Sequence, residues 1–411
     1  MELTNILIGQ SGGPTAVINS TLAGAVAAAK ESGKIGHVYG MLNGIKGYLE
    51  GRKTDLLDLT EEELRLLKTT PAAYLGSCRF KLPKELSDPL YAEIFRRLEE
   101  DNIGYVLYIG GNDSMDTADK LSQYAASVGS DIRIIGVPKT IDNDLTGTDH
   151  TPGYGSAAKF VAAQVRQIVL DAEVYRQDAV TIVEIMGRNA GWLTAAASLA
   201  RKYEGDNPVL IYLPEVDFDP EDMLRRIREA LKERHAVVVC VSEGIHDKDG
   251  ILICELTQGV TKDVFGNKQL SGCGKVIEQM VRVRLGVKVR SVELNVTQRC
   301  NAVEASLTDV EEAFECGRQG VFAALEGKTG CMISMEREEG EEYRIVYTAK
   351  PVGEISNEVR GVPTEWITED LADVKEAFAA YALPLIQGES RPPMKDGLPV
   401  FLYRKDPNHK A

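Results

Sequence analysis

Short apolar runs that end in glycine and lead into helical sequence recur along the chain, and this alternation constrains the fold most. We expect strands at residues 5–10, 104–111, 132–140, 179–187 and 236–244. We expect helices at residues 13–33, with Gly33 as a stop, and at residues 113–129. Apolar runs followed by helices are typical of parallel strands with crossover connections. The pattern therefore predicts the α/β class with doubly wound parallel sheets.

Length and charge narrow the possible functions. A chain of 411 residues is long enough for about two or three domains. A formal net charge of -15 argues against a general nucleic-acid surface. No apolar stretch reaches the roughly 18 residues that a membrane span needs, and no basic region precedes the first apolar run as in a signal peptide. We expect neither a nucleic-acid nor a membrane partner.

The cysteines and histidines exclude several kinds of site. The seven cysteines are scattered singly with no CxxC pair, so neither a disulfide framework nor a zinc site is expected. Reduced thiols predict a cytoplasmic protein. None of the five histidines lies beside a serine or cysteine in a nucleophile motif, which argues against a triad hydrolase.

Unusual polar motifs follow the predicted strands. They are QSGGP (10–14), GGNDS (110–114), PKTIDND (138–144), MGRNAG (186–191) and SEGI (242–245). Ligands of open parallel sheets bind beyond the carboxyl ends of the strands, so these motifs predict one composite site or a few adjacent sites. The long, strand-poor stretch 138–156 is expected to cross between two lobes.

The glycine-rich motifs are suited to phosphate. In SGGP the glycines let the backbone approach a ligand, and a helix start favours an anion, although a tight turn explains the motif equally well. GGND repeats this pattern but places Asp113 near a helix start. That acid either interacts with the helix dipole or binds a magnesium ion that also contacts phosphate.

KTIDND is the more specific motif. Lys139, Asp142 and Asp144 lie within six residues, and their crowding is costly unless a metal or an anion balances it. One acid can take a proton from an attacking hydroxyl while the other helps to hold a metal. The competing interpretation is a surface loop built on an Asx-turn.

Single charged residues in three later motifs could complete a phosphate and sugar site. Arg188 lies beside two glycines, and its planar guanidinium suits phosphate. Glu243 follows an apolar strand and could accept hydrogen bonds from sugar hydroxyls. Arg290 and Arg299 lie in VRSVELNVTQR. Arg188 could equally form a surface ion pair, and Glu243 could equally be an acid at a helix start. Arginines such as Arg290 and Arg299 are more often surface ion-pair partners than ligand contacts.

Taken together, the motifs resemble the phosphofructokinase family. SGGP, LGSCRF, GGND, KTIDND, MGRNAG, SEG and TQR occur in that family's order between residues 11 and 299. The resemblance implies 6-phosphofructokinase activity and two doubly wound, Rossmann-like lobes with the active site between them. We expect a donor-binding lobe at 1–154, completed by 299–350, a fructose-6-phosphate-binding lobe at 155–298 and a C-terminal extension at 351–411.

Two positions favour the pyrophosphate-using branch of the family. That branch resembles GGDDS and PKTIDND, whereas the ATP-using branch has GGDGS and PGTIDND; this chain has Asp113 and Lys139 at the discriminating positions. An aspartate at 113 fills the space that the α-phosphate and nucleoside need, and repels another anion. Lys139 supplies positive charge to the shorter donor.

The resemblance also implies a role for each site residue. Asp142 would be the base for the sugar 1-hydroxyl, Lys139 would stabilise the transferred phosphoryl group, and Thr140 would shape the site. Asp113 and Asp144 would position Mg²⁺. Gly13, Arg79, Asp113 and Lys139 would bind pyrophosphate. Thr140, Asp142, Met186, Gly187, Arg188, Glu243, Arg290 and Arg299 would bind fructose 6-phosphate. In the family one of the last two arginines comes from a neighbouring subunit, which implies a homodimer or homotetramer.

Three positions depart from the family pattern. Asn112 stands where an aspartate is common, so one magnesium contact is weakened or rearranged. Val296 replaces the His or Tyr that contacts the sugar. Ala179 replaces a phosphate-binding arginine, for which Arg176 either substitutes or points away.

Alternatives from other classes have less support. ATP-dependent phosphofructokinase is the runner-up, and related acceptors such as sedoheptulose 7-phosphate share the same end-group chemistry. A non-catalytic sugar-phosphate sensor has no need for the base in TIDND. A dinucleotide-dependent dehydrogenase would need the third spaced glycine that GGNDS lacks.

The donor assignment predicts the behaviour of a double variant. Asp113→Gly combined with Lys139→Gly should clearly lower turnover with pyrophosphate, because the charge that favours the short donor is removed. We expect little gain with ATP, since an adenine pocket is also required. Steady-state kinetics with both donors measure the effect, and unchanged pyrophosphate kinetics would refute the roles of both residues.

Overall fold

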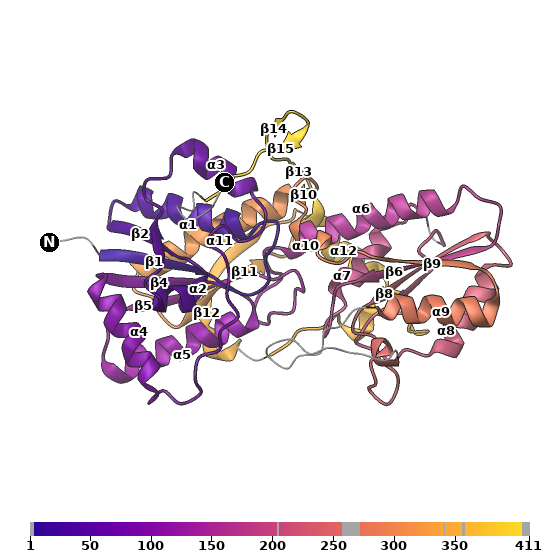
Figure 1. Ribbon diagram of the computed structural model, residues 1–411, viewed down its shortest axis with the longest axis horizontal. Coiled ribbons are helices and arrows are strands. Elements are labelled where there is room, and N and C mark those ends of the chain that lie inside the picture. The colour runs from indigo at the N-terminus through magenta and orange to yellow at the C-terminus, as the bar shows by residue number, and fades with distance from the viewer. Residues whose placement is uncertain (1–3, 204, 257–271, 341, 356–357, 405–411) are drawn as a thin grey trace.

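Two sheets, one in each lobe, organise the chain (Figure 1). The computed structural model describes residues 4–203, 205–256, 272–340, 342–355 and 358–404. The first lobe holds a seven-stranded sheet of order β12-β11-β5-β4-β1-β2-β3, and the second a four-stranded sheet of order β7-β8-β6-β9. The predicted α/β class with two lobes is confirmed.

The first sheet is parallel at its centre and antiparallel at both edges. Its strands are β1 (Thr4–Gln10), β2 (Ile35–Met41), β3 (Lys53–Asp55), β4 (Ile103–Gly110), β5 (Arg133–Pro138), β11 (Cys331–Arg337) and β12 (Ile345–Pro351). β3 pairs antiparallel with β2, and β12 pairs antiparallel with β11. The sheet is therefore mixed rather than purely parallel as predicted. Its central strands are parallel, and only the edge strands β3 and β12 run antiparallel to their neighbours.

Helices cover both faces of this sheet. Along β1, Ile6 and Ile8 face a core shared with α1 (Ile18–Ser32) and α11 (Leu307–Leu325). Leu7 faces the opposite core, which contains α4 (Pro89–Glu100) and α5 (Asn112–Val128). Two shorter helices, α2 (Gly44–Leu49) and α3 (Glu61–Thr69), complete the lobe. Alternating side chains buried on both faces explain why the strands appear in the sequence as continuous apolar runs.

The first helix is shorter than the predicted 13–33. It begins at Ile18, and the SGGP motif lies in a loop before it. Gly12 has φ +76°, which is not a helical angle, and the Gly13 carbonyl accepts a hydrogen bond from Lys139. These two residues therefore belong to the loop and not to the helix. The end agrees with the prediction, since Gly33 caps the helix at φ 60°. The predicted helix at 113–129 is confirmed as α5.

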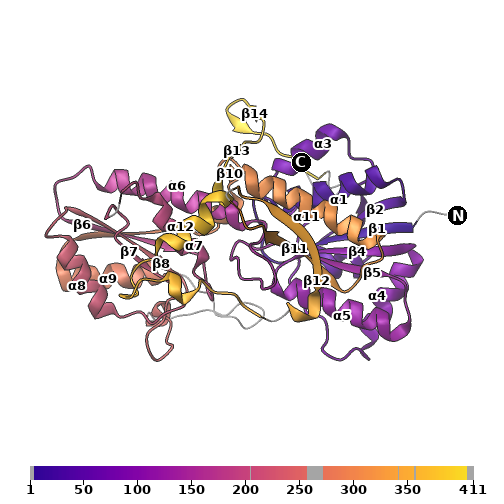
Figure 2. The same ribbon diagram turned by 180° about the vertical axis from the view of Figure 1, so that it is seen from behind.

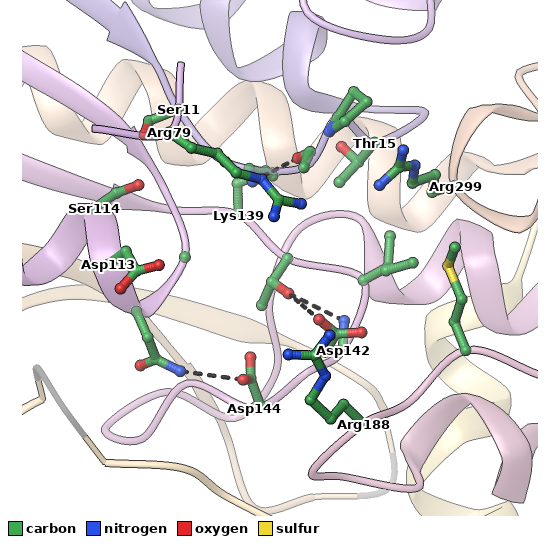
Figure 3. Close-up of a pocket in the computed structure, with 18 of the residues that line it drawn as sticks. Ser11, Thr15, Arg79, Asp113, Ser114, Lys139, Asp142, Asp144, Arg188 and Arg299 are labelled. Atoms are coloured by element: carbon green, nitrogen blue, oxygen red, sulfur yellow. Dashed lines mark hydrogen bonds between the residues drawn. The ribbon is translucent and has the colours of Figure 1, made fainter. Parts of the chain in front are cut away.

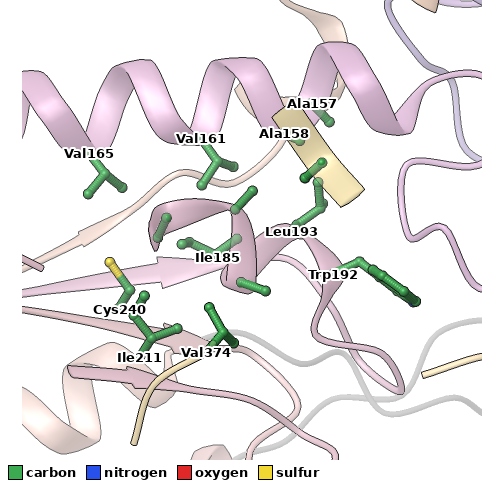
Figure 4. Packing of buried hydrophobic residues seen from close by; sticks show 14 of the residues in the cluster. Ala157, Ala158, Val161, Val165, Ile185, Trp192, Leu193, Ile211, Cys240 and Val374 are labelled. Carbon is green, nitrogen blue, oxygen red and sulfur yellow. The ribbon is translucent and has the colours of Figure 1, made fainter. Parts of the chain in front are cut away.

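The second sheet is parallel throughout. Its strands are β6 (Ala179–Ile185), β7 (Leu210–Tyr212), β8 (Ala236–Ser242) and β9 (Lys288–Glu293). One face packs on α6 (Tyr154–Ala172), α7 (Trp192–Ala195) and the 3₁₀ turn η1 (Ala196–Ala200), as Figure 4 shows. The other face packs on α8 (Pro220–Ala230), η2 (Ile253–Leu256) and α9 (Cys273–Leu285).

The chain then returns to the first lobe and comes back to the second. α10 (Thr297–Cys300) and β10 (Ala305–Ser306) lead into α11, and η3 (Val352–Glu354) follows β12. Residues 360–386, named here the returning segment, then lie along the second lobe (Figure 2). This segment holds η4 (Thr364–Trp366), α12 (Glu376–Ala382) and η5 (Leu383–Ile386). Val362, Phe378 and Leu385 are buried in the core shared with α6.

The last described residues cross back over the first lobe. β13 (Glu389–Ser390) pairs with β10, and β14 (Met394–Lys395) forms a small hairpin with β15 (Leu398–Pro399). The backbone N–H of Leu402 donates to Thr70 Oγ1. The extension predicted at 351–411 thus includes β-strand, core and surface segments, and its end at 405–411 lies outside the described residues. The domain boundaries stay a prediction.

Among the described residues, no helix is long and apolar enough to span a bilayer.

The contact between α1 and α11 leaves no room for a side chain at Gly24. A Cβ built on Gly24 of α1 would lie 1.9 Å from the Phe314 carbonyl oxygen of α11. Gly24→Ala should lower the free energy of unfolding by about 1–3 kcal/mol, because this overpacking outweighs the better helix propensity of alanine. Chemical denaturation measures it. Gly340→Ala is the control, since a Cβ there meets nothing within 4 Å; equal stability of both variants would contradict the packing argument.

Candidate active site

A pocket of about 420 Å³ lies between the two lobes, at the carboxyl ends of strands from both sheets. Residues that follow β1, β4, β5, β6 and β8 line it, together with Arg299 of α10 (Figure 3). Of the predicted site residues, it brings together Gly13, Arg79, Asp113, Lys139, Thr140, Asp142, Asp144, Met186, Arg188, Glu243 and Arg299. Gly187 and Arg290 do not line it. The roles of all these residues stay predictions.

Lys139 is buried at the end of β5. Its ammonium group donates a hydrogen bond of 2.7 Å to the Gly13 carbonyl, so it lies against the SGGP loop. Its backbone N–H donates to Gly110, the last residue of β4. Burial lowers the pKa of Lys139 to about 8, while Asp142 and Asp144 oppose that shift. The site therefore presents a positive charge to a ligand at neutral pH.

Asp142 is held in a short turn with Thr140. The Asp142 backbone N–H donates to Thr140 Oγ1 at 3.1 Å, and that hydroxyl donates to Asp142 Oδ2 at 3.4 Å. Burial raises the pKa of Asp142, and Lys139 opposes the rise. A carboxylate with a raised pKa is a better proton acceptor than an exposed one. The position and chemistry of Asp142 suit a general base.

Asp144 and Asn112 form a neighbouring pair. Asn112 Nδ2 donates to Asp144 Oδ2 at 3.1 Å, and Asn112 Oδ1 is buried with no hydrogen-bond partner among the described residues. Burial and the nearby Asp142 raise the pKa of Asp144 to about 6. A divalent cation would satisfy the orphaned oxygen and favour the ionised carboxylate.

The described residues offer few side chains that could hold a metal ion together. Among the described residues, no group of three or more His, Cys, Asp or Glu side chains is arranged to hold a metal ion. This fits Mg²⁺, which keeps several waters and is usually held by one or two carboxylates together with substrate phosphates.

Asp113 points into the pocket from the first turn of α5 and is largely exposed. Its Oδ1 lies 3.3 Å from Lys81 Nζ, and both side chains are more than half exposed. Ion pairs of this kind contribute little to stability, so the pair is free to rearrange around a ligand. Lys81 was not predicted from the sequence.

The second lobe contributes an acid and an arginine. Glu243 follows β8, and burial raises its pKa to about 7, which leaves it partly protonated at neutral pH. Arg188 and Met186 follow β6. Gly187 has a structural role in this loop: it has φ +145°, and a Cβ there would lie 2.5 Å from the Ala190 carbonyl oxygen, so a larger residue would not fit. Its N–H donates to Glu243 Oε1 at 3.4 Å, so it orients the acid without lining the pocket.

The two predicted phosphate-binding arginines lie apart. Arg299 is in the pocket, with Nη1 3.4 Å from the position that a Cβ on Gly13 would take. Arg290 lies on the edge strand β9, is exposed, and pairs with Asp171 at 3.4 Å. Within one chain Arg290 therefore does not reach the pocket, which fits the expectation that one arginine acts on a neighbouring subunit.

Two of the three departures from the family pattern, Ala179 and Val296, lie outside the pocket, whereas Asn112 lines it. Ala179 begins β6, Arg176 is exposed before it, and Val296 is exposed before α10. Arg176 does not line the pocket either, so it does not replace the missing arginine there within one chain.

Several lining residues were missed in the sequence. They are Ser11, Gly12, Pro14, Thr15, Cys78, Phe80, Lys81, Gly111, Ser114, Ile141 and Asn189. Most of them belong to motifs that the sequence analysis recognised. Their positions in the sequence beside Gly13, Arg79 and Arg188 could have indicated that they line the same pocket. Lys81 had a further signal, because it is a second cation two residues after Arg79.

Comparison with known proteins gives the same assignment as the motifs. A family model described as phosphofructokinase matches residues 5–320. The chain belongs to the phosphofructokinase family.

Similar proteins of this family cover nearly the whole chain. Pyrophosphate--fructose 6-phosphate 1-phosphotransferase of Halomonas elongata is 37% identical, over 97% of this chain and 96% of that protein. The crystal structure of a pyrophosphate-dependent phosphofructokinase from Nitrosospira multiformis is 35% identical with a TM-score of 0.89, over 98% of this chain and 97% of that one. A sulfofructose kinase of Alkalicoccus urumqiensis is 33% identical, over 86% of this chain and 88% of that protein.

The lowered pKa of Lys139 predicts how pyrophosphate binding depends on pH. The ammonium form is present below about pH 8 and is lost as pH rises through that value. Pyrophosphate affinity, measured by calorimetric titration, should therefore fall above about pH 8. In Lys139→Arg the side chain stays charged and this loss should disappear. The arginine variant also controls for the ionisation of pyrophosphate itself, and an identical decline in both proteins would contradict the prediction.

Proposed function

We propose that the protein transfers a phosphoryl group from pyrophosphate to the 1-hydroxyl of fructose 6-phosphate, giving fructose 1,6-bisphosphate and phosphate. The observation that carries this proposal is that Asp113 and Lys139 line the same pocket as Asp142. An acid at 113 and a buried ammonium group at 139 leave room and charge for a short dianionic or trianionic donor, whereas a nucleotide would meet the acid. The names of the similar proteins support the same donor and acceptor.

In this proposal Asp142 accepts the proton of the sugar 1-hydroxyl. Lys139 and Arg79 stabilise charge on pyrophosphate, the backbone at Gly13 approaches it, and Thr140 holds Asp142 in place. Phosphoryl transfer depends mainly on positioning and charge stabilisation, so these groups suffice without a covalent intermediate. The phosphate donor and the product ester have comparable transfer potential, so the reaction is expected to be reversible.

The acceptor would bind on the side of the second lobe. Met186, Arg188 and Glu243 would contact the sugar, with Gly187 orienting Glu243. Arg299 would hold the 6-phosphate, and Arg290 would do so from a neighbouring copy of the chain. The proposal therefore includes a homodimer or homotetramer, which the exposure of Arg290 supports.

Magnesium is part of the proposal. Asp144 and Asp113 would hold Mg²⁺, and the unpartnered Asn112 Oδ1 is a further oxygen beside Asp144. When bound, the ion would neutralise charge on the phosphate oxygens. All seven cysteines are free thiols, which supports the proposed location in the cytoplasm.

A donor and acceptor panel tests the proposal. We expect turnover with pyrophosphate and fructose 6-phosphate in both directions, and much less with ATP or with sulfofructose as acceptor. Comparable turnover with ATP and none with pyrophosphate would refute the donor, and preference for sulfofructose would refute the acceptor. The variant Asp142→Asn tests the assignment of the base. It should lower kcat by about 100- to 10,000-fold while leaving sugar-phosphate binding nearly intact.

A further inference from the structure

The loop that carries Asp142 and Asp144 has almost no secondary structure of its own. It runs from Lys139 to Gly153 between β5 and α6, with one backbone bridge between Thr140 and Gly153. Buried carbonyl groups in such a loop need partners, because an unpaired buried carbonyl is costly. The positions of the two acids therefore depend on whatever bonds the loop from outside.

Arg360 donates four hydrogen bonds to backbone carbonyls of this loop. Its Nη1 donates to the carbonyls of Thr148 at 2.8 Å and Asp149 at 2.6 Å, and its Nη2 donates to the carbonyl of Asn143 at 3.1 Å. Its backbone N–H donates to the carbonyl of Asp144 at 2.9 Å. One residue thus bonds the backbone between the two acids, at Asp144 itself and after it, and it lies more than two hundred residues away in the sequence.

Arg360 is itself fixed to the loop that carries the sugar-side residues. Its carbonyl accepts the indole N–H of Trp192 at 2.9 Å, and its guanidinium lies 4.8 Å from the centre of a Trp192 ring. Two residues on, the N–H of Val362 donates to Glu215 Oε1 at 2.7 Å. The same oxygen accepts the N–H of Gly191, also at 2.7 Å, at the end of MGRNAG.

Tyr381 of the returning segment adds two more bonds to the acidic loop. Its hydroxyl accepts from Asn143 Nδ2 at 2.8 Å and donates to the Asp149 carbonyl at 2.9 Å. Asn143 has φ 55° and is fully buried, so this bond holds the backbone between Asp142 and Asp144 in a conformation that is uncommon for a residue other than glycine.

We propose that Arg360 is a positioning residue that sets the loop of Asp142 and Asp144 relative to the loop of Met186 and Arg188. This role rests on the proposed phosphoryl transfer. The planar guanidinium of Arg360 binds three carbonyls at once in a fixed geometry. The ammonium group of a lysine rotates freely and does not reproduce this geometry. Arg360 does not line the pocket, so it acts on the reaction only through these loops.

The main test compares Arg360→Met with a matched control. In Arg360→Met we expect kcat to fall about 100-fold, because a displacement of about 1 Å at the base costs that much. The KM values for pyrophosphate and fructose 6-phosphate should change little, which marks a loss confined to the transition state. The control is Arg201→Met, since Arg201 also binds the returning segment, through Asp373 at 2.8 and 2.9 Å and away from the pocket. It should lose thermal stability but keep kcat.

Two further measurements separate positioning from folding. Guanidinium chloride at millimolar concentration should partly restore kcat in Arg360→Met, whereas urea at the same concentration should not. If Arg360→Met does not fold, Arg360→Lys and Tyr381→Phe replace it, and both should lower kcat with little change in KM. Wild-type kcat in all folded Arg360 and Tyr381 variants, or an equal loss of kcat in Arg201→Met, would overturn the proposal. An inactive wild-type enzyme would instead refute the proposed function.

Discussion

The buried charges of Lys139, Asp142 and Asp144 impose the strongest constraint on this structure. An ammonium group and two carboxylates are buried in one pocket; both acids affect the pKa of Lys139, and Lys139 affects the pKa of both acids. Such a cluster is unfavourable unless its members have fixed partners. Those partners are the Gly13 carbonyl, the Thr140 hydroxyl and the Asn112 amide, which lie in the segments that follow β1, β5 and β4. The parallel sheet is what brings these three loops to one edge.

The second lobe and the returning segment stabilise the same site from the other side. Glu215 joins Gly191 to Val362, and Arg360 joins Trp192 to the acidic loop. These bonds connect the loop of Met186 and Arg188 with the acids through backbone groups. Because both lobes and a distant segment meet here, the pocket is formed by the tertiary structure as a whole rather than by a single βα unit.

The sequence predicted the central strands well, because side chains such as Ile6, Leu7 and Ile8 are buried on both faces and leave an unbroken apolar run. It also placed the acidic and arginine-bearing motifs at the strand ends that line the pocket. It missed the true start of α1 at Ile18, because the loop conformation of Gly13 is set by Lys139 from 126 residues away. Arg360 was missed for the same reason: nothing near it in the sequence indicates that its partners are the carbonyls of residues 143, 148 and 149.

The sequence separation of Arg360 from its partners has a consequence for how the protein is made. Asn143 and Arg360 are 217 residues apart, so the acidic loop leaves the ribosome about 10–40 s before the residue that holds it. During that interval the first lobe can build most of its sheet, but the loop between β5 and α6 has no guanidinium to bond its carbonyls. Since β11 and β12 of the first lobe are also synthesised after the whole second sheet, neither lobe can finish folding before the other has been translated. The complete arrangement of the acidic loop can therefore form only after nearly the whole chain has been synthesised.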